Sequence, residues 1–352
     1  MTPPRKSVVT GGAGFVGTNL TARLVEDGRD VVVLDNLSRP GVRDNLRWLQ
    51  TTYGSVLRIE VGDIRDSRTL RRVLEGAAEV YHLAAQVAVT TSLDSPVEDF
   101  RVNAEGTLGL LEEIRRLEEP PFLLFTSTNK VYGTLDDLEL QRIGARWEPT
   151  DLAIHAAGLS ERRPLDFCTP YGCSKGAADQ YVLDYAKSYG IPAVVFRMSC
   201  IYGPHQHGTE DQGWVAHFAI RALEGRPITL FGDGAQVRDL LFVDDLVEAM
   251  LLARDGASRL AGQAFNMGGG PANAVSLLEV VELLRSLGAP VCVRHAEERP
   301  GDQRYYVADT RRFAAATGWS PEVDASEGIE RLYRWLAGRP VPARAALRAV
   351  AL

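Results

Sequence analysis

The chain has 352 residues, of which 45% are hydrophobic and 24% are charged, and its formal net charge is −7. This length can bury the core of one large α/β domain and a smaller lobe. The negative charge argues against nucleic acid as a partner. Without a long apolar run we expect no membrane span, and residues 1–6 are too short and polar for a secretory signal. We therefore expect a cytoplasmic protein.

The first motif along the chain is a glycine-rich turn between an apolar run and a stretch with helical periodicity, which predicts a strand, a tight turn and a helix. Gly11 can take a backbone geometry closed to other residues, Gly14 lets a pyrophosphate approach the main chain, and Gly17 allows close packing of helix on strand. The helix N-terminus faces the phosphates with free N–H groups and the positive end of its dipole. The turn therefore predicts dinucleotide binding.

A second strand is predicted at 30–34, and Asp35 follows it directly. An acidic side chain at this spacing grips the hydroxyls of the adenosine ribose and repels a 2′-phosphate. The pattern thus favours NAD over NADP, although Arg39 and Arg43 lie nearby and weaken that preference.

Short apolar runs then alternate with helical patterns, which predicts a doubly wound parallel sheet with helices on both faces. The ligand of such a sheet lies beyond the carboxyl ends of its strands. Polar motifs fall at those ends and should converge on one cleft. The runs are 56–61, 80–83, 122–125 and 193–196, and the motifs that follow them are 62–64, 83–86, 126–129 and 197–200.

From about residue 201 the sequence becomes rich in glycine and proline, which predicts loops mixed with short strands and helices. We expect residues 1–200 to form a dinucleotide-binding domain, with a returning segment at about 236–267. Residues 201–235 and 268–336 should form a smaller substrate-binding lobe, because clefts between lobes favour ligands. Residues 337–352 are predicted to be a tail without chemistry.

Tyr171 and Lys175 are one helical turn apart, so they share a face if the segment up to Tyr189 is helical. A tyrosine has a pKa of about 10, and a positive charge about 4 Å away at an effective dielectric of about 20 could lower that value by up to about three units. Tyr171 could then act as a base near neutral pH. The alternative is a solvated surface pair. The upstream glycine turn and Thr128 favour the catalytic interpretation.

These motifs together resemble the extended short-chain dehydrogenase/reductases of the nucleotide-sugar epimerase/dehydratase family, over residues 6–336. The resemblance implies a Rossmann fold, bound NAD, and catalysis by Thr128, Tyr171 and Lys175. Tyr171 would remove a proton from a sugar hydroxyl as hydride leaves the same carbon for the nicotinamide. Thr128 would bond the reacting oxygen, and Lys175 would also hold the nicotinamide ribose.

The matching positions also imply two sets of binding residues. For NAD they are Gly11, Gly14, Phe15, Val16, Gly17, Asp35, Asn36, Ser38, Arg39, Asp63, Ile64, Leu83, Ala84, Ala85, Gln86, Asn103, Thr126, Tyr171, Lys175 and Arg197. For a nucleotide-diphosphate sugar they are Val87, Thr128, Asn129, Lys130, Ser199, Cys200, Gln212, Val215, Arg238, Arg299 and Asp302.

Several positions in the substrate set need comment. Arg238 and Arg299 match positions that hold nucleotide phosphates and ribose, and guanidinium forks suit phosphate oxygens. A structural ion pair with Asp239 or Asp245 is the alternative for Arg238. Asp302 matches a ribose-binding position. Cys200 stands where many relatives carry asparagine, and a thiol is a poorer partner for the sugar diphosphate.

Dehydratases of the family place an acidic pair directly after the threonine, because expulsion of a sugar hydroxyl needs a proton donor and a base. This chain has Asn129 and Lys130 there. Neither supplies a carboxylic acid, so oxidation followed by re-reduction is favoured over elimination.

Blocks at 126–133, 166–181 and 211–215 most closely resemble the CDP-tyvelose 2-epimerases, also called CDP-paratose 2-epimerases. The similarity implies inversion at C2 of a CDP-hexose through a 2-keto sugar. A 4-epimerase acting on a UDP-sugar or another nucleotide sugar, and a non-catalytic NAD-binding protein, are the alternatives. The insertion at about 135–166 is either a lid over the sugar or a passive surface loop.

Two further expectations concern metals and assembly. Cys168, Cys173, Cys200 and Cys292 lack metal or disulfide spacing, and we expect His205 and His207 to be solvated loop residues, so we predict no metal site. The apolar faces of 106–117 and 181–189 are those that family members pair across subunits. We therefore expect a homodimer or homotetramer, and the alternative is a monomer that buries these faces within its own core.

Overall fold

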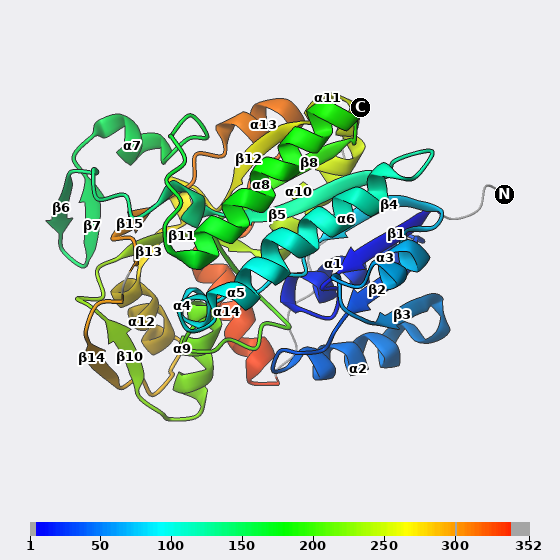
Figure 1. The fold of residues 1–352 in the computed structure, drawn as a ribbon. Helices are drawn as coiled ribbons and strands as arrows, with labels where there is room; N and C mark the ends of the chain where they lie inside the picture. The colour runs from blue at the N-terminus through cyan, green and yellow to red at the C-terminus, as the bar shows by residue number, and fades with distance from the viewer. Residues whose placement is uncertain (1–4, 300, 339–352) are drawn as a thin grey trace, which may run out of the picture.

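A computed structural model of the chain describes residues 5–299 and 301–338. Its centre is a seven-stranded sheet in which every neighbouring pair of strands is parallel, as predicted (Figure 1). Chain order reverses at β1, so the first βα turn lies at the switch point where ligands of such sheets bind. In spatial order the strands are β12 (Gln263–Met267), β8 (Ala193–Met198), β5 (Phe122–Thr128), β4 (Ala77–His82), β1 (Lys6–Thr10), β2 (Asp30–Asp35) and β3 (Leu57–Val61).

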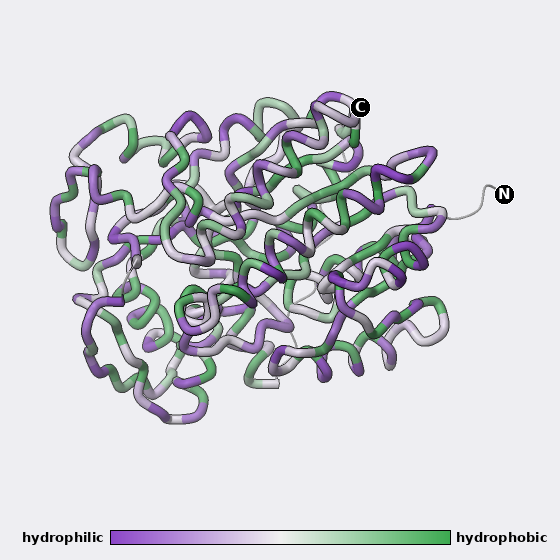
Figure 2. Tube along the Cα trace, in the orientation of Figure 1, coloured by the Kyte–Doolittle hydropathy of each residue, from purple (hydrophilic) through white to green (hydrophobic). Residues whose placement is uncertain are grey.

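Helices cover both faces of this sheet, over two separate hydrophobic cores. Successive residues of a strand face opposite sides, so Val8 joins one core and Val9 the other, and both are fully buried. The core of Val8 lies against α3 (Ser67–Leu74), α6 (Gly106–Arg115) and α8 (Thr169–Tyr189). The core of Val9 lies against α1 (Phe15–Glu26), α2 (Val42–Tyr53) and α10 (Val243–Asp255). In Figure 2 green hydrophobic stretches run through the central strands, and purple residues recur along the outward side of α2.

Two central strands run further toward the ligand edge than the sequence predicted. β5 continues through Thr128 and β8 through Met198, so residues 126–128 and 197–198 are strand residues rather than loop. The parallel ladder continues between them, pairing Thr126 with Phe196 and Thr128 with Met198. Buried threonines suit an extended backbone, which explains the added strand length.

A second region contains small sheets around a third hydrophobic core. β11 (Val237–Phe242) pairs with β13 (Ala274–Ser276), β15 (Tyr305–Tyr306) and β9 (Cys200–Tyr202), and β10 (Ile228–Phe231) pairs with β14 (Val293–Ala296). This core is covered by α9 (Trp214–Leu223), α12 (Leu277–Ser286) and α14 (Ala325–Leu336). After β11 the chain returns to the central sheet through α10 and β12. Shorter helices are α4 (Val89–Asp94), α5 (Pro96–Phe100), α11 (Ala257–Leu260) and α13 (Arg311–Thr317).

The insertion at 135–166 forms an antiparallel hairpin of β6 (Leu140–Ile143) and β7 (Arg146–Pro149), followed by α7 (Leu152–Ala157). Several hydrogen bonds fasten it to the smaller region, two of which come from Arg146 and Trp147. The Arg146 guanidinium donates to the Glu279 carboxylate on α12 (Nη2–Oε2 2.6 Å), and the Trp147 backbone N–H donates to the Ala235 carbonyl (3.0 Å). The hairpin therefore packs beside the small sheets, at the left of Figure 1.

Within residues 5–299 and 301–338 we find no helix of the length and apolarity that a membrane crossing requires. Of the predicted tail at 337–352, residues 339–352 lie outside the described part of the chain.

Candidate active site

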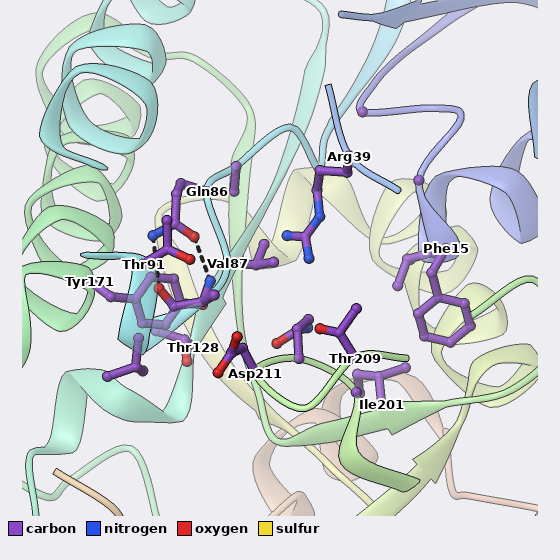
Figure 3. Close-up of a pocket in the computed structure, with 18 of the residues that line it drawn as sticks. Phe15, Arg39, Gln86, Val87, Thr91, Thr128, Tyr171, Ile201, Thr209 and Asp211 are labelled. Atoms are coloured by element: carbon purple, nitrogen blue, oxygen red, sulfur yellow. Dashed lines mark hydrogen bonds between the residues drawn. The ribbon is translucent and has the colours of Figure 1, made fainter. Parts of the chain in front are cut away.

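A cavity of about 920 Å³ opens at the carboxyl ends of the central strands and extends to β10 and β11. Figure 3 shows Phe15 on one side of it and Tyr171 with Thr128 on the other. Residues from both regions of the fold line it, and no residue between 135 and 166 does. The insertion is therefore not a lid in this structure; it packs away from the cavity.

The glycine turn forms a cradle that side chains would fill. Gly11 has φ +68°, and a Cβ there would lie 2.7 Å from the Ala84 backbone nitrogen. A Cβ on Gly17 would lie 2.2 Å from the Gly11 carbonyl oxygen, whereas one on Gly14 would meet only that oxygen, at 3.1 Å. The bare backbone and the start of α1 thus give a diphosphate a close approach, which fits a dinucleotide.

Asp35 ends β2 as predicted and lines the cavity. It accepts hydrogen bonds from the backbone N–H groups of Ala13 (3.1 Å) and Leu37 (2.8 Å). Burial raises the pKa of Asp35, and these backbone N–H groups oppose the rise. The carboxylate is therefore held in place at the end of β2, beside the glycine turn.

The Arg39 side chain points into the cavity between Phe15 and Tyr171 (Figure 3). Within the described part of the chain it has no ion-pair partner. Burial lowers the pKa of Arg39, and Tyr171 opposes that shift. A cation without a carboxylate partner therefore faces the predicted reaction centre.

Most of the predicted binding and catalytic residues line this one cavity. On the dinucleotide side they are Gly11, Gly14, Phe15, Val16, Gly17, Asp35, Asn36, Ser38, Arg39, Asp63, Ile64, Leu83, Ala84, Ala85, Gln86, Thr126, Tyr171 and Lys175. On the substrate side they are Val87, Thr128, Asn129, Lys130, Ser199, Cys200, Gln212, Arg238, Arg299 and Asp302.

Three predicted residues do not line the cavity, and each is buried for another reason. Asn103 exchanges two hydrogen bonds with the backbone of Gln86 (2.9 and 3.0 Å) and so holds that loop. Arg197 is 5% exposed and pairs with Asp179 of α8. Val215 is 1% exposed and belongs to the core of the smaller region.

Tyr171 and Lys175 both lie on α8 and line the cavity, as their spacing predicted. Burial raises the pKa of Tyr171 to about 12, and the Asp99 carboxylate adds to the rise. The neighbouring Thr128 hydroxyl and the Arg39 guanidinium act in the opposite direction.

The sequence predicted that Lys175 lowers the pKa of Tyr171, but Thr128 and Arg39 are the groups that do so in this structure. Burial lowers the pKa of Lys175 to about 7, against the opposing effect of Asp179 and Asp99. Its Nζ lies over the face of Phe125, 4.2 Å from the ring centroid. Arg39 is a cation that lowers the pKa of Tyr171 in this structure, whereas the Lys175 amine faces an aromatic ring.

A charged cluster occupies the substrate side. Arg238 donates to Asp302 (Nη2–Oδ1 2.7 Å), so its partner is neither of the carboxylates considered from sequence, Asp239 and Asp245. Lys130 donates to the Gly301 carbonyl (3.2 Å), and its Nζ lies 3.8 Å from Asp302. Burial, followed by Arg238, lowers the pKa of Lys130 to about 8. Two cations therefore share one carboxylate here, which suits an anionic ligand.

Arg299 stacks on Phe231, with its guanidinium carbon 3.7 Å from the ring centroid. It also donates to the Glu210 carbonyl (2.9 Å) and lies 3.6 Å from Asp211. The far end of the cavity thus combines a flat aromatic ring with a guanidinium.

Burial raises the pKa of Cys200 to about 12, so this thiol stays neutral.

Sequence reasoning missed several residues of the site. Gln303 is fully buried and bonds Asn129, and Asp99 bonds Gln86 and Ser174. A motif search could not find them, because they support site residues from distant places in the chain.

The expectation of a solvated loop is wrong for His205. It is 8% exposed and lies 4.2 Å from the ring of Trp48 and 5.1 Å from that of Trp335. The two indoles, which come from α2 and α14, cover much of its ring, although His205 also lines the cavity.

The model of the NAD dependent epimerase/dehydratase family matches residues 7–268. The chain belongs to this family. Its cofactor is NAD, and the glycine cradle and Asp35 fit that group.

Relatives of several activities match nearly the whole chain. The CDP-paratose 2-epimerase of Salmonella typhi is 41% identical over 338 residues, covering 94% of this chain and 98% of that protein. The UDP-glucose 4-epimerase of Thermus thermophilus, solved with NAD, superposes with a TM-score of 0.79 at 33% identity, covering 95% of this chain and 99% of that chain. DesIV, a dTDP-glucose 4,6-dehydratase from Streptomyces venezuelae solved with NAD and TYD, gives 0.80 at 30%, covering 95% and 97%.

Proposed function

We propose that this chain is an NAD-dependent nucleotide-sugar epimerase, an isomerase that inverts C2 of a CDP-hexose of the CDP-paratose and CDP-tyvelose type. The observation that carries the proposal is the 41% identity over nearly full length to a CDP-paratose 2-epimerase. Tyr171 and Thr128 lining the same cavity as the glycine cradle support it.

The residues would be used as follows. When bound, NAD supplies the acceptor for hydride from the sugar carbon and returns the same hydride. Tyr171 takes the proton of the sugar hydroxyl as the carbon–oxygen double bond forms, and gives it back when that bond is reduced from the opposite face. Thr128, which lines the cavity with Tyr171, holds the reacting oxygen. The Lys175 amine holds the nicotinamide ribose. The hydride and the proton both return to the sugar in each cycle, so no external reductant is consumed.

The residues after Thr128 favour this outcome over elimination. Asn129 carries an amide and Lys130 an amine, so neither offers a carboxylic acid to a leaving hydroxyl. The amide donates to Gln303 (3.1 Å), and the amine donates to the Gly301 carbonyl. A 2-epimerase must also bring the carbon next to the anomeric centre to the nicotinamide, which draws the diphosphate toward the catalytic residues. The cluster of Lys130 and Arg238 beside Asn129 supplies cations at that place.

The alternative is a 4-epimerase acting on a UDP-sugar or another nucleotide sugar, favoured by the likeness to UDP-glucose 4-epimerases. A panel of nucleotide sugars, incubated with the protein in ordinary and deuterated water and followed by NMR, separates the two. We expect inversion at C2 without solvent deuterium at that carbon. Inversion at C4, or a 4-keto-6-deoxy product, would contradict the proposal, and retention of the biological role by Tyr171→Phe would favour a non-catalytic NAD-binding protein.

We further propose a cytoplasmic homodimer or homotetramer. Support comes from exposed aromatic residues on α8, with Tyr181 45% and Tyr189 50% exposed. The division into a dinucleotide-binding domain (1–200, with a return at about 236–267) and a substrate-binding lobe (201–235 and 268–336) is part of the same proposal, as are the roles of the residues named above.

A further inference from the structure

A chain of hydrogen bonds runs from the smaller region to the threonine beside Tyr171. The Gln303 amide donates from Nε2 to the Gly133 carbonyl (2.6 Å). The Asn129 amide donates from Nδ2 to Oε1 of Gln303 (3.1 Å), and the Thr128 hydroxyl donates to Oδ1 of Asn129 (3.3 Å). Gln303 is fully buried, and Thr128 and Asn129 are 6% and 9% exposed.

The chemistry of the first partner fixes every later orientation. A backbone carbonyl can only accept, so Gln303 must turn its NH₂ group toward Gly133 and its oxygen toward Asn129. Asn129 must then present its NH₂ group to Gln303, which leaves its oxygen facing Thr128. The Thr128 proton is therefore directed to Asn129, and the Thr128 oxygen keeps lone pairs for the Lys130 backbone N–H (3.2 Å) and for the reacting groups.

We propose that Gln303 is a positioning residue, which sets the direction of the Thr128 hydroxyl through Asn129 and thereby tunes the proposed epimerisation. This inference rests on the proposed function. Gln303 touches none of the reacting atoms, and it does not line the cavity. It acts by holding one of two orientations of a buried amide, since a reversed Asn129 would present donors to Thr128.

Gln303→Glu tests this because a carboxyl group can complete the chain only when it is protonated. The neutral acid donates its O–H to Gly133 and accepts from Asn129, but the ionised form turns an acceptor toward the Gly133 carbonyl. The titratable and charged groups around this chain are Asp166, Asp302, Lys130, Arg238 and Tyr171.

We expect kcat of Gln303→Glu to be near wild type at low pH and to fall on the order of tenfold to a hundredfold as pH rises through the pKa of the introduced carboxyl group. KM for CDP-paratose should change little. Gln303→Met, which breaks the chain at every pH, should show a similar loss of kcat without the added pH dependence. Asn273→Asp is the matched control, since that buried amide also joins backbone groups, Val323 (3.4 Å) and Ala325 (2.8 Å), away from the cavity.

A kcat profile of Gln303→Glu parallel to wild type, or a wild-type kcat in Gln303→Met, would overturn the inference. If wild type inverts no sugar of the panel, the proposed function fails, and the melting temperature of Gln303→Glu then judges the amide chain alone. That temperature should fall as pH rises, because the folded state favours the neutral acid. A temperature profile parallel to wild type would disprove the chain.

Discussion

Arg197 and Asp179 form a buried ion pair with two parallel hydrogen bonds, from Nε to Oδ2 and from Nη2 to Oδ1, each 2.9 Å long. The pair ties the end of β8 to the middle of α8, the helix that carries Tyr171. The same guanidinium also donates from Nη1 to the Tyr132 hydroxyl oxygen (3.2 Å). Arg197 thus holds α8 against β8.

Arg197→Met should lower the free energy of unfolding by about 3–5 kcal/mol, because it leaves a buried carboxylate unpaired. Affinity for NAD should stay the same in the folded protein. Urea unfolding and titration with NAD measure the two effects. Arg39→Met is the control with the opposite expectation, weaker NAD binding and nearly unchanged stability, because Arg39 points into the cavity. Weaker NAD binding by a stable Arg197→Met would contradict this assignment.

Tyr171→Phe should lower kcat by on the order of 10²–10⁴ while bound NAD is retained. The substitution removes the hydroxyl that carries the proton but keeps the aromatic ring at this position of α8. Product formation by NMR, with NAD content measured after denaturation, checks both parts. A variant that keeps wild-type kcat would show that another group moves the proton.

Two glycines of the cradle should respond differently to alanine. Gly17→Ala places a Cβ against backbone atoms at 2.2 and 2.6 Å, so we expect a loss of about 1–3 kcal/mol in stability. Gly14→Ala meets only one oxygen, at 3.1 Å, so it should fold normally but bind NAD at least about tenfold more weakly. Thermal unfolding and NAD titration of both variants distinguish a packing effect from a binding effect. Equal stability of the two would refute the difference.

His82 predicts a pH dependence of stability. Its ring is held by Thr10 (2.7 Å) and Thr107 (2.9 Å), and burial, assisted by Lys175, lowers its pKa from 6.5 to about 3. Between these values the unfolded chain binds a proton that the folded chain does not, so stability falls as pH drops from about 6.5 to 3. His82→Gln should flatten this part of the curve, measured by urea unfolding across the range. An unchanged slope would rule out His82 as the source.

Much of the fold and part of the site could be predicted from sequence, because local patterns encode them. Apolar runs predicted the parallel sheet, and the glycine turn and the four-residue spacing of Tyr171 and Lys175 located parts of one cavity. The partner of Arg197 was missed, since a strand-end arginine looks the same whether it faces a ligand or Asp179. Gln303 was missed because it meets Asn129 across 174 positions, and no periodicity connects them.

The hairpin of β6 and β7 also limits how the chain can be dissected. It follows β5 in sequence, yet Arg146 and Trp147 fasten it to segments that begin after residue 230. A fragment ending near residue 200 would lose both anchors together with the outermost strand beside β8. Limited proteolysis should therefore release no autonomous N-terminal half.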